Sequence, residues 1–164
     1  MHVMLGVHRR RGANYVKPLQ RSSRKLSNME LEIAAPRHLM EKTQMARLVL
    51  TVDDSPSIRL MMQLTLSGEG YEVKQTTDGV EALEFARDHS ADLVLTDINM
   101  PRMDGFTLIR ELRMLPAYKC VPMLVLTTES TQDKKMLGKE AGATGWLVKP
   151  FNPQQLLAAI NRVL

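Results

Sequence analysis

The chain changes character within residues 93–105, which read LVLTDINMPRMDG. Its first four residues are apolar or β-branched and predict a buried strand, and the Asn, Pro, Asp and Gly that follow predict a turn. Asp97 therefore lies where a buried strand leaves its sheet. Ligands of open α/β sheets bind beyond the carboxyl ends of the strands, so this aspartate is a candidate for chemistry. By itself it could equally be a turn or helix-capping residue.

Short apolar runs alternate with amphipathic segments on both sides of this stretch. We expect strands at residues 48–52, 71–75, 93–96, 121–126 and 144–148. Helices are expected at residues 56–67, 78–89, 106–114, 132–141 and 154–164, the first of them capped by Ser55 with Pro56 at its first position. Apolar strands joined by helices predict an α/β fold: a doubly wound parallel sheet with helices on both faces and right-handed crossovers.

The charge is distributed unevenly along the 164 residues. Residues 1–46 hold nine Lys and Arg against three acidic residues, whereas the rest hold 13 basic and 15 acidic residues. We expect residues 1–46 to be a basic, disordered leader and residues 47–164 to form one folded domain. The leader could also be a transit peptide, a phosphate-binding arm, or a segment preceding a physiological start at Met45.

Several classes of protein are disfavoured by composition. No apolar run approaches the ~20 residues that span a bilayer, so we expect no membrane association. The single cysteine, Cys120, excludes an internal disulfide and suits a cytoplasmic location. Because the excess positive charge belongs to the leader, nucleic-acid binding is not expected. A regulator acting on DNA through the leader would need salt-dependent affinity that disappears when residues 1–45 are deleted.

Polar side chains follow four of the predicted strands. Asp53 and Asp54 follow the first strand, Asp97 the third, Thr127 the fourth and Lys149 the fifth. Because the carboxyl ends of parallel strands share one edge of a sheet, these side chains should converge, which favours the chemical interpretation of Asp97 over the capping one.

The converging residues suit phosphoryl transfer. Three adjacent carboxylates repel one another unless a divalent cation neutralises them, and oxygen ligands suit Mg²⁺ or Mn²⁺. A carboxylate can attack phosphorus to give an aspartyl phosphate. A lysine and a hydroxyl can donate to the phosphoryl oxygens as their negative charge grows.

Residues 48–164 resemble the receiver domain of two-component response regulators, most closely the single-domain CheY-type chemotaxis regulators. The motifs that carry the resemblance are VDDS at 52–55, DINMPRMDG at 97–105, LTTE at 126–129 and WLVKPF at 146–151. The resemblance implies a flavodoxin-like (βα)5 fold with strand order 2-1-3-4-5. It also implies phosphorylation of Asp97 by a histidine kinase, CheA-like in a chemotaxis system. A flagellar switch or another output protein, and possibly a phosphatase, would be further partners.

The resemblance also assigns roles to individual residues. Asp54, Asp97 and the backbone carbonyl of Asn99 would bind Mg²⁺ directly, and Asp53 would act largely through water. Lys149 would contact the phosphoryl group, Thr127 would move toward it, and the Lys149–Pro150 bond would be cis. Trp146 stands at the switch position, where Tyr or Phe is more common, so the usual rotation of that aromatic is in doubt. A plain packing role is the alternative.

Three further expectations concern the signal. Asn99 and Glu129 match positions that set the rate of aspartyl-phosphate hydrolysis, although both could be merely exposed loop residues. The binding face should be the fourth helix, fifth strand and fifth helix, near Lys134, Lys135, Trp146 and Gln154. We expect no enzyme activity beyond self-phosphorylation and self-dephosphorylation. The alternatives are a phosphorelay intermediate, a stress-signalling receiver, or a phosphatase resembling the haloacid dehalogenases. Those phosphatases use a second aspartate where this chain has Asn99.

Overall fold

A computed structural model describes residues 46–129 and 131–164. The predicted leader therefore lies outside the described residues, apart from its last position. No helix within the described ranges is long and apolar enough to cross a membrane.

Five strands alternate with five α-helices along the described chain, as the apolar pattern predicts. The elements are β1 (Leu48–Val52), α2 (Pro56–Gly68), β2 (Glu72–Thr76), α3 (Gly79–Asp88), β3 (Leu93–Asp97), α4 (Gly105–Met114), the 3₁₀ turn η2 (Pro116–Tyr118), β4 (Met123–Thr127), α5 (Gln132–Ala141), β5 (Gly145–Val148) and α6 (Pro153–Ile160).

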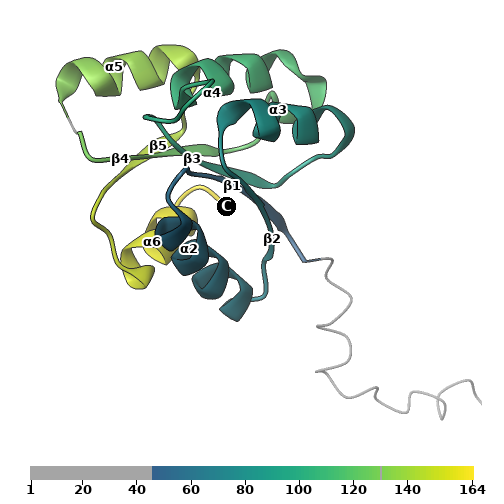
Figure 1. Ribbon diagram of the computed structural model, residues 1–164, viewed down its shortest axis with the longest axis vertical. Coiled ribbons are helices and arrows are strands. Elements are labelled where there is room, and N and C mark those ends of the chain that lie inside the picture. The colour runs from purple at the N-terminus through teal and green to yellow at the C-terminus, as the bar shows by residue number, and fades with distance from the viewer. Residues whose placement is uncertain (1–45, 130) are drawn as a thin grey trace, which may run out of the picture. The chain divides into compact units, whose positions relative to one another are not determined.

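The strands form one parallel sheet in the order β2-β1-β3-β4-β5, which confirms the predicted topology. Helices α3, α4 and α5 cover one face, and α2 and α6 cover the other (Figure 1). Every residue of β3 and β4 is buried, because central strands of such a sheet are covered on both sides. One apolar cluster fills each side of the sheet. This rigid centre holds the end of β3, and with it Asp97, in place.

The structure differs from the sequence-based boundaries in a few places. Strand β4 begins at Met123, two residues later than predicted, and the sequence analysis missed the 3₁₀ turn at Pro116–Tyr118. Helix α6 ends at Ile160 instead of residue 164, although turn-type hydrogen bonds continue to Leu164. Ser55 stands at the N-cap of α2 and Pro56 at its first position, as predicted, but the Ser55 side chain makes no capping hydrogen bond within the described residues.

Candidate functional site

The carboxyl ends of four strands bring the predicted polar residues to one edge of the sheet. Asp97 is the last residue of β3 and Thr127 the last of β4. Asp53 and Asp54 directly follow β1, and Lys149 directly follows β5. The convergence follows from the parallel topology, since the strands that deliver these residues are hydrogen-bonded neighbours.

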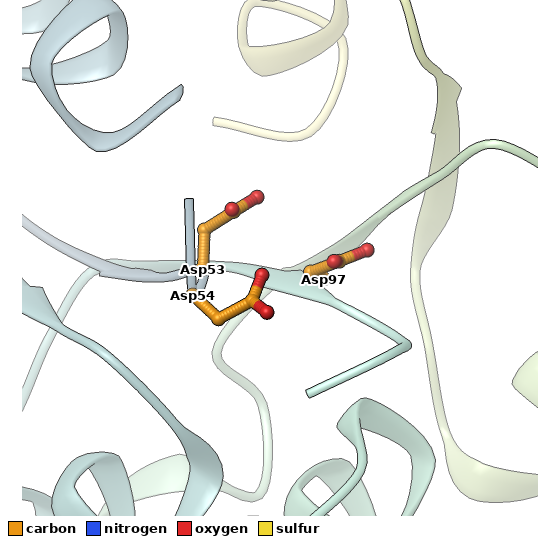
Figure 2. Close-up of side chains that lie close together, drawn as sticks. All are labelled: Asp53, Asp54 and Asp97. Atoms are coloured by element: carbon orange, nitrogen blue, oxygen red, sulfur yellow. The ribbon is translucent and has the colours of Figure 1, made fainter. Parts of the chain in front are cut away.

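Three carboxylates form the centre of the site (Figure 2). One oxygen from each of Asp53, Asp54 and Asp97 can be chosen so that all three lie within 4.8 Å of one another. Asp53 is fully buried and Asp97 is 7% exposed, whereas Asp54 is exposed. The cluster therefore opens to solvent on the side of Asp54.

Lys149 supplies a positive charge to the two buried carboxylates. Its Nζ lies 2.7 Å from Oδ2 of Asp53 and 3.2 Å from Oδ2 of Asp97. The lysine side chain is itself only 12% exposed, so water screens these interactions weakly. The peptide bond between Lys149 and Pro150 is cis.

The ionisation of Asp97 is opposed by its surroundings. Burial is the largest influence and raises the pKa of Asp97; the nearby Asp53 carboxylate raises it further. The Lys149 ammonium and the hydrogen bond from the Ile98 amide, 2.8 Å from Oδ1, lower it without cancelling the rise. The pKa of this carboxyl therefore lies above its ordinary value, and an additional cation would favour the charged form that can act as a nucleophile.

The backbone around Asp97 is closely packed against the start of α4. A Cβ placed on Gly105 would lie 2.1 Å from the Asp97 carbonyl oxygen, so no larger residue fits there without a shift. The Gly105 amide donates to the carbonyl of Ile98 at 3.0 Å, and Asp104 caps α4 through the amides of Phe106 and Thr107. These contacts close the loop of residues 98–104.

Two groups that support Asp53 were missed in the sequence analysis. The Ser55 amide donates to Oδ1 of Asp53 at 2.9 Å, and Nη1 of Arg59 donates to the Asp53 carbonyl at 2.8 Å. Arg59 lies one helical turn after the start of α2, and this closeness in sequence to Asp53 and Asp54 could have identified it as a partner.

The predicted switch residue Thr127 and the predicted hydrolysis residues Asn99 and Glu129 lie at the ends of β3 and β4 or in the loops that follow them. Thr127 is buried, and its hydroxyl oxygen accepts a hydrogen bond from the Glu129 amide at 3.0 Å. Glu129 is exposed and its carboxylate lies 3.8 Å from Nζ of Lys134. Asn99 is exposed, two residues beyond Asp97.

Trp146 is half-buried between the sheet and two helices. Its ring centroid lies 6.0 Å from that of Phe106 at an angle of 35°, and a Cβ on Gly138 would lie 2.6 Å from its Cζ3 atom. The indole nitrogen is buried without a hydrogen-bond partner among the described residues. An unpaired buried donor makes this inward position of the ring less favourable than its packing alone suggests.

The residues present fit a hard divalent cation. Three carboxylates in one cluster offer only oxygen ligands, and one of them faces solvent. Mg²⁺ prefers such ligands and usually retains several water molecules, for which an open site leaves room.

Comparisons with known proteins agree with this geometry. The family model described as the response regulator receiver domain matches residues 49–161. Among solved structures, the chemotaxis response regulator CheY4 of Vibrio cholerae is 51% identical, with a TM-score of 0.71, over 73% of this chain and 99% of that one. The receiver domain of the sensor histidine kinase PA1611 from Pseudomonas aeruginosa, with a magnesium ion coordinated in its active-site cleft, is 29% identical. Its TM-score is 0.67, over 72% of this chain and 97% of that one.

Curated relatives include transcriptional regulators. The alkaline phosphatase synthesis transcriptional regulatory protein PhoP of Bacillus subtilis is 35% identical over 120 residues, which are 73% of this chain and 49% of PhoP. The response regulator GtcR of Aneurinibacillus migulanus is 37% identical over 120 residues and 48% of its own length. The chain thus spans about half the length of these curated relatives.

Proposed function

This chain belongs to the response regulator receiver family, and on that premise we propose that Asp97 accepts a phosphoryl group from a histidine kinase. An oxygen of the Asp97 carboxylate attacks phosphorus while the bond from phosphorus to the kinase histidine nitrogen breaks. That nitrogen keeps the bonding electron pair, and because the other ring nitrogen of the phosphohistidine is already protonated, the imidazole leaves as a neutral ring. Lys149 stays beside the phosphoryl group and Thr127 donates its hydroxyl proton to a phosphoryl oxygen, because both offset the negative charge of the transferred group.

The position of Lys149 is the observation that carries this proposal. A largely buried lysine that contacts both Asp53 and Asp97 keeps a hydrogen-bond donor within reach of a phosphoryl group attached to Asp97. Asp54 completes a cluster able to hold Mg²⁺, with the carbonyl of Asn99 as a further ligand and Asp53 acting mostly through water. When bound, the cation neutralises negative charge on the incoming phosphoryl oxygens. Mn²⁺ has the same preference for oxygen and should substitute.

Intact-protein mass spectrometry tests the proposal directly. The protein is incubated with a small acyl phosphate, with and without Mg²⁺, as wild type, as Asp97→Asn and as Asp88→Asn. Asp88 is an exposed carboxylate at the end of α3 and serves as the control. We expect one Mg²⁺-dependent phosphoryl group on the wild type and the control, and none on Asp97→Asn. An Asp97→Asn variant phosphorylated as fully as wild type would overturn the assignment.

The phosphorylated state should be short-lived, with Asn99 and Glu129 setting its lifetime. Both are exposed, two residues beyond the ends of β3 and β4 at the edge of the sheet that carries Asp97, so we expect their side chains to orient an attacking water. Changing either to Ala should alter the decay rate of the phosphorylated protein, measured by mass after removal of the donor. Unchanged decay in both variants would assign these residues to the ordinary exposed surface of the loops.

We propose that the signal leaves through α5, β5 and α6, by contact with a partner protein. Exposed apolar side chains of this face, Met136, Leu137 and Val148, are 57%, 48% and 42% exposed, and Lys134 and Lys135 lie beside them. The likeness to the chemotaxis protein CheY4 over 99% of that chain supports a role in chemotaxis. In that role we expect a CheA-like kinase and a flagellar switch as the partners. Phosphorylation-dependent binding to a purified switch protein would support chemotaxis. Transfer to a histidine phosphotransfer protein would favour a phosphorelay intermediate instead.

The remaining assignments are part of the same proposal. The chain acts as a cytoplasmic signalling protein, and its own catalysis extends only to gaining and losing the phosphoryl group. A separate phosphatase would assist its return to the unphosphorylated state. Turnover of small phosphate monoesters by the purified protein, abolished in Asp97→Asn, would instead assign it to the phosphatases that use an aspartate nucleophile.

A further inference from the structure

We infer that Arg102, held by Asp78, positions the loop of residues 98–104 and thereby sets the affinity of the site for Mg²⁺. This inference rests on the proposed Mg²⁺ site, because it concerns the loop that carries the Asn99 carbonyl. Neither Arg102 nor Asp78 belongs to the carboxylate cluster, so both would act as positioning residues.

An ion pair joins the loop to α3. Nε of Arg102 donates to Oδ2 of Asp78 at 2.8 Å, and Nη2 of the same guanidinium contacts the same oxygen. The Asp78 side chain is only 5% exposed, and its other oxygen accepts from the amides of Val80 and Glu81 as the N-cap of α3. The guanidinium is thus anchored to a carboxylate that is itself fixed by the helix.

The charged state of this anchor is secure at neutral pH. Burial is the largest influence on Asp78 and would raise its pKa. The hydrogen bonds from Arg102 and from the amides of Glu81 and Val80 together outweigh burial, so the pKa lies below its ordinary value. Asp78 therefore stays ionised, and the pair persists in the range where the site binds Mg²⁺.

The backbone conformation of Arg102 requires compensation. Its φ is +65°, in the left-handed region that a side chain makes unfavourable and that glycine adopts easily. A glycine at this position would adopt the same φ without strain but could not form the ion pair with Asp78. The loop would then lose this attachment to α3. The ion pair is therefore a contribution of this particular residue.

A second contact fastens the same part of the loop. A Cβ placed on Gly79 would lie 2.8 Å from Cγ and 2.9 Å from the backbone oxygen of Met103, so Met103 rests directly on the start of α3. Residues 102 and 103 are thus both held by the segment of Asp78 and Gly79. Asn99 lies between this attachment and Asp97, so its carbonyl is carried on a span fixed at both ends.

We expect the loss of the Arg102–Asp78 ion pair to lower the affinity of the site for Mg²⁺. Metal affinity depends on how closely the ligands are held in their binding geometry, and partners bonded directly to ligands typically contribute ~10- to 100-fold. Arg102 acts one step further away, through the backbone, so we expect its loss to weaken Mg²⁺ binding about fivefold. Replacing it with glycine has two opposing effects on the stability of the fold, because glycine relieves the unfavourable φ while the Asp78 carboxylate loses its cationic partner. Unfolding of the metal-free proteins therefore has to be measured beside Mg²⁺ affinity.

Calorimetric titration with Mg²⁺ alone tests the inference, together with urea unfolding of each metal-free protein. The variants are Arg102→Gly, Arg102→Lys, Asp78→Asn and the double variant Arg102→Gly/Asp78→Asn. Arg110→Ala, an exposed arginine on α4 that bonds only within its own helix in the described structure, is the control. Asp78→Asn retains a capping side chain, since Asn caps helices as well as Asp does.

We expect Arg102→Gly and Asp78→Asn each to weaken Mg²⁺ binding about fivefold, and the double variant to lose no more than either alone. Arg102→Lys should recover part of the affinity, because lysine keeps the charge without the two-pronged contact. Wild-type affinity in both single variants would overturn the inference while leaving the Mg²⁺ site intact. A wild-type protein that binds no Mg²⁺ would instead refute the proposed function, and this inference with it.

Discussion

Gly138→Ala should destabilise the domain even though alanine is the better helix former. Gly138 lies inside α5, directly over the indole of Trp146. A Cβ there would be 2.6 Å from Cζ3 of Trp146 and 3.2 Å from Cε1 of Phe106. The first distance is well inside van der Waals contact, so the indole or the helix must move.

Two opposing effects set the size of the change. Replacing glycine by alanine inside a helix is favourable by about 1 kcal/mol. Forcing an additional carbon into a packed region typically costs about 1–3 kcal/mol. Taking about 2 kcal/mol for the collision, the variant should lose about 1 kcal/mol of unfolding free energy, or roughly 4 °C in Tm for a domain of this size.

Making Gly138→Ala in the Trp146→Phe variant as well tests whether the contact with the indole causes the loss of stability. Trp146→Phe removes the Cζ3 atom and with it the 2.6 Å approach, whereas the 3.2 Å approach to Cε1 of Phe106 and the helix preference remain. There Gly138→Ala should stabilise the domain by up to about 1 kcal/mol, which makes the coupling between the two sites up to about 2 kcal/mol. Urea unfolding followed by far-UV circular dichroism measures all four proteins without relying on tryptophan. A change of the same sign and size in both backgrounds would refute the packing argument.

Three other changes test the site and its support. Asp97→Asn should stabilise the metal-free protein at pH 7, because the raised pKa of Asp97 means that its ionised form disfavours folding. In the wild type, the ionisation of Asp97 lowers the free energy of unfolding as pH rises through the folded-state pKa of that carboxyl. The greater stability of Asp97→Asn should therefore be seen at neutral pH and should shrink toward about pH 4. Lys149→Met should lower the unfolding free energy of the metal-free protein, measured in urea, by about 3 kcal/mol, because Asp53 and Asp97 lose their cation. Added Mg²⁺ should reduce this difference in stability between the variant and the wild type. Arg113→Ala should cost about 2–3 kcal/mol by thermal unfolding, since its guanidinium donates to the carbonyls of Tyr118, Val121 and Gly142, and Arg113→Lys should recover only part.

The elements could be predicted from the sequence because they depend on local patterns. Apolar runs located all five strands, and parallel topology then placed Asp53, Asp97 and Lys149 at one edge without any knowledge of side-chain contacts. The contacts between distant segments could not be predicted in this way. Asp78 and Arg102 stand 24 residues apart, and whether an arginine reaches a given carboxylate depends on the path of the loop between them. The fit of Gly138 over Trp146 likewise exists only once α5 has packed on the sheet.

The hydrogen bonds of Thr127 offer a route by which a phosphoryl group on Asp97 would change the surroundings of Trp146. The Thr127 hydroxyl accepts from the Glu129 amide, so it can donate its proton to a phosphoryl oxygen without breaking that bond. Its movement toward Asp97 would therefore draw the start of the loop before α5 along with it. The Thr127 carbonyl also accepts from the Lys149 amide at 2.7 Å, and Trp146 lies three residues before Lys149 on the same strand segment. A shift of α5 relative to β5 changes the space between Gly138 and the indole, whose buried nitrogen gains a partner in water if the ring turns outward. The unpaired indole nitrogen thus lowers the free energy needed for the outward state, and the sole tryptophan should report the change by its fluorescence.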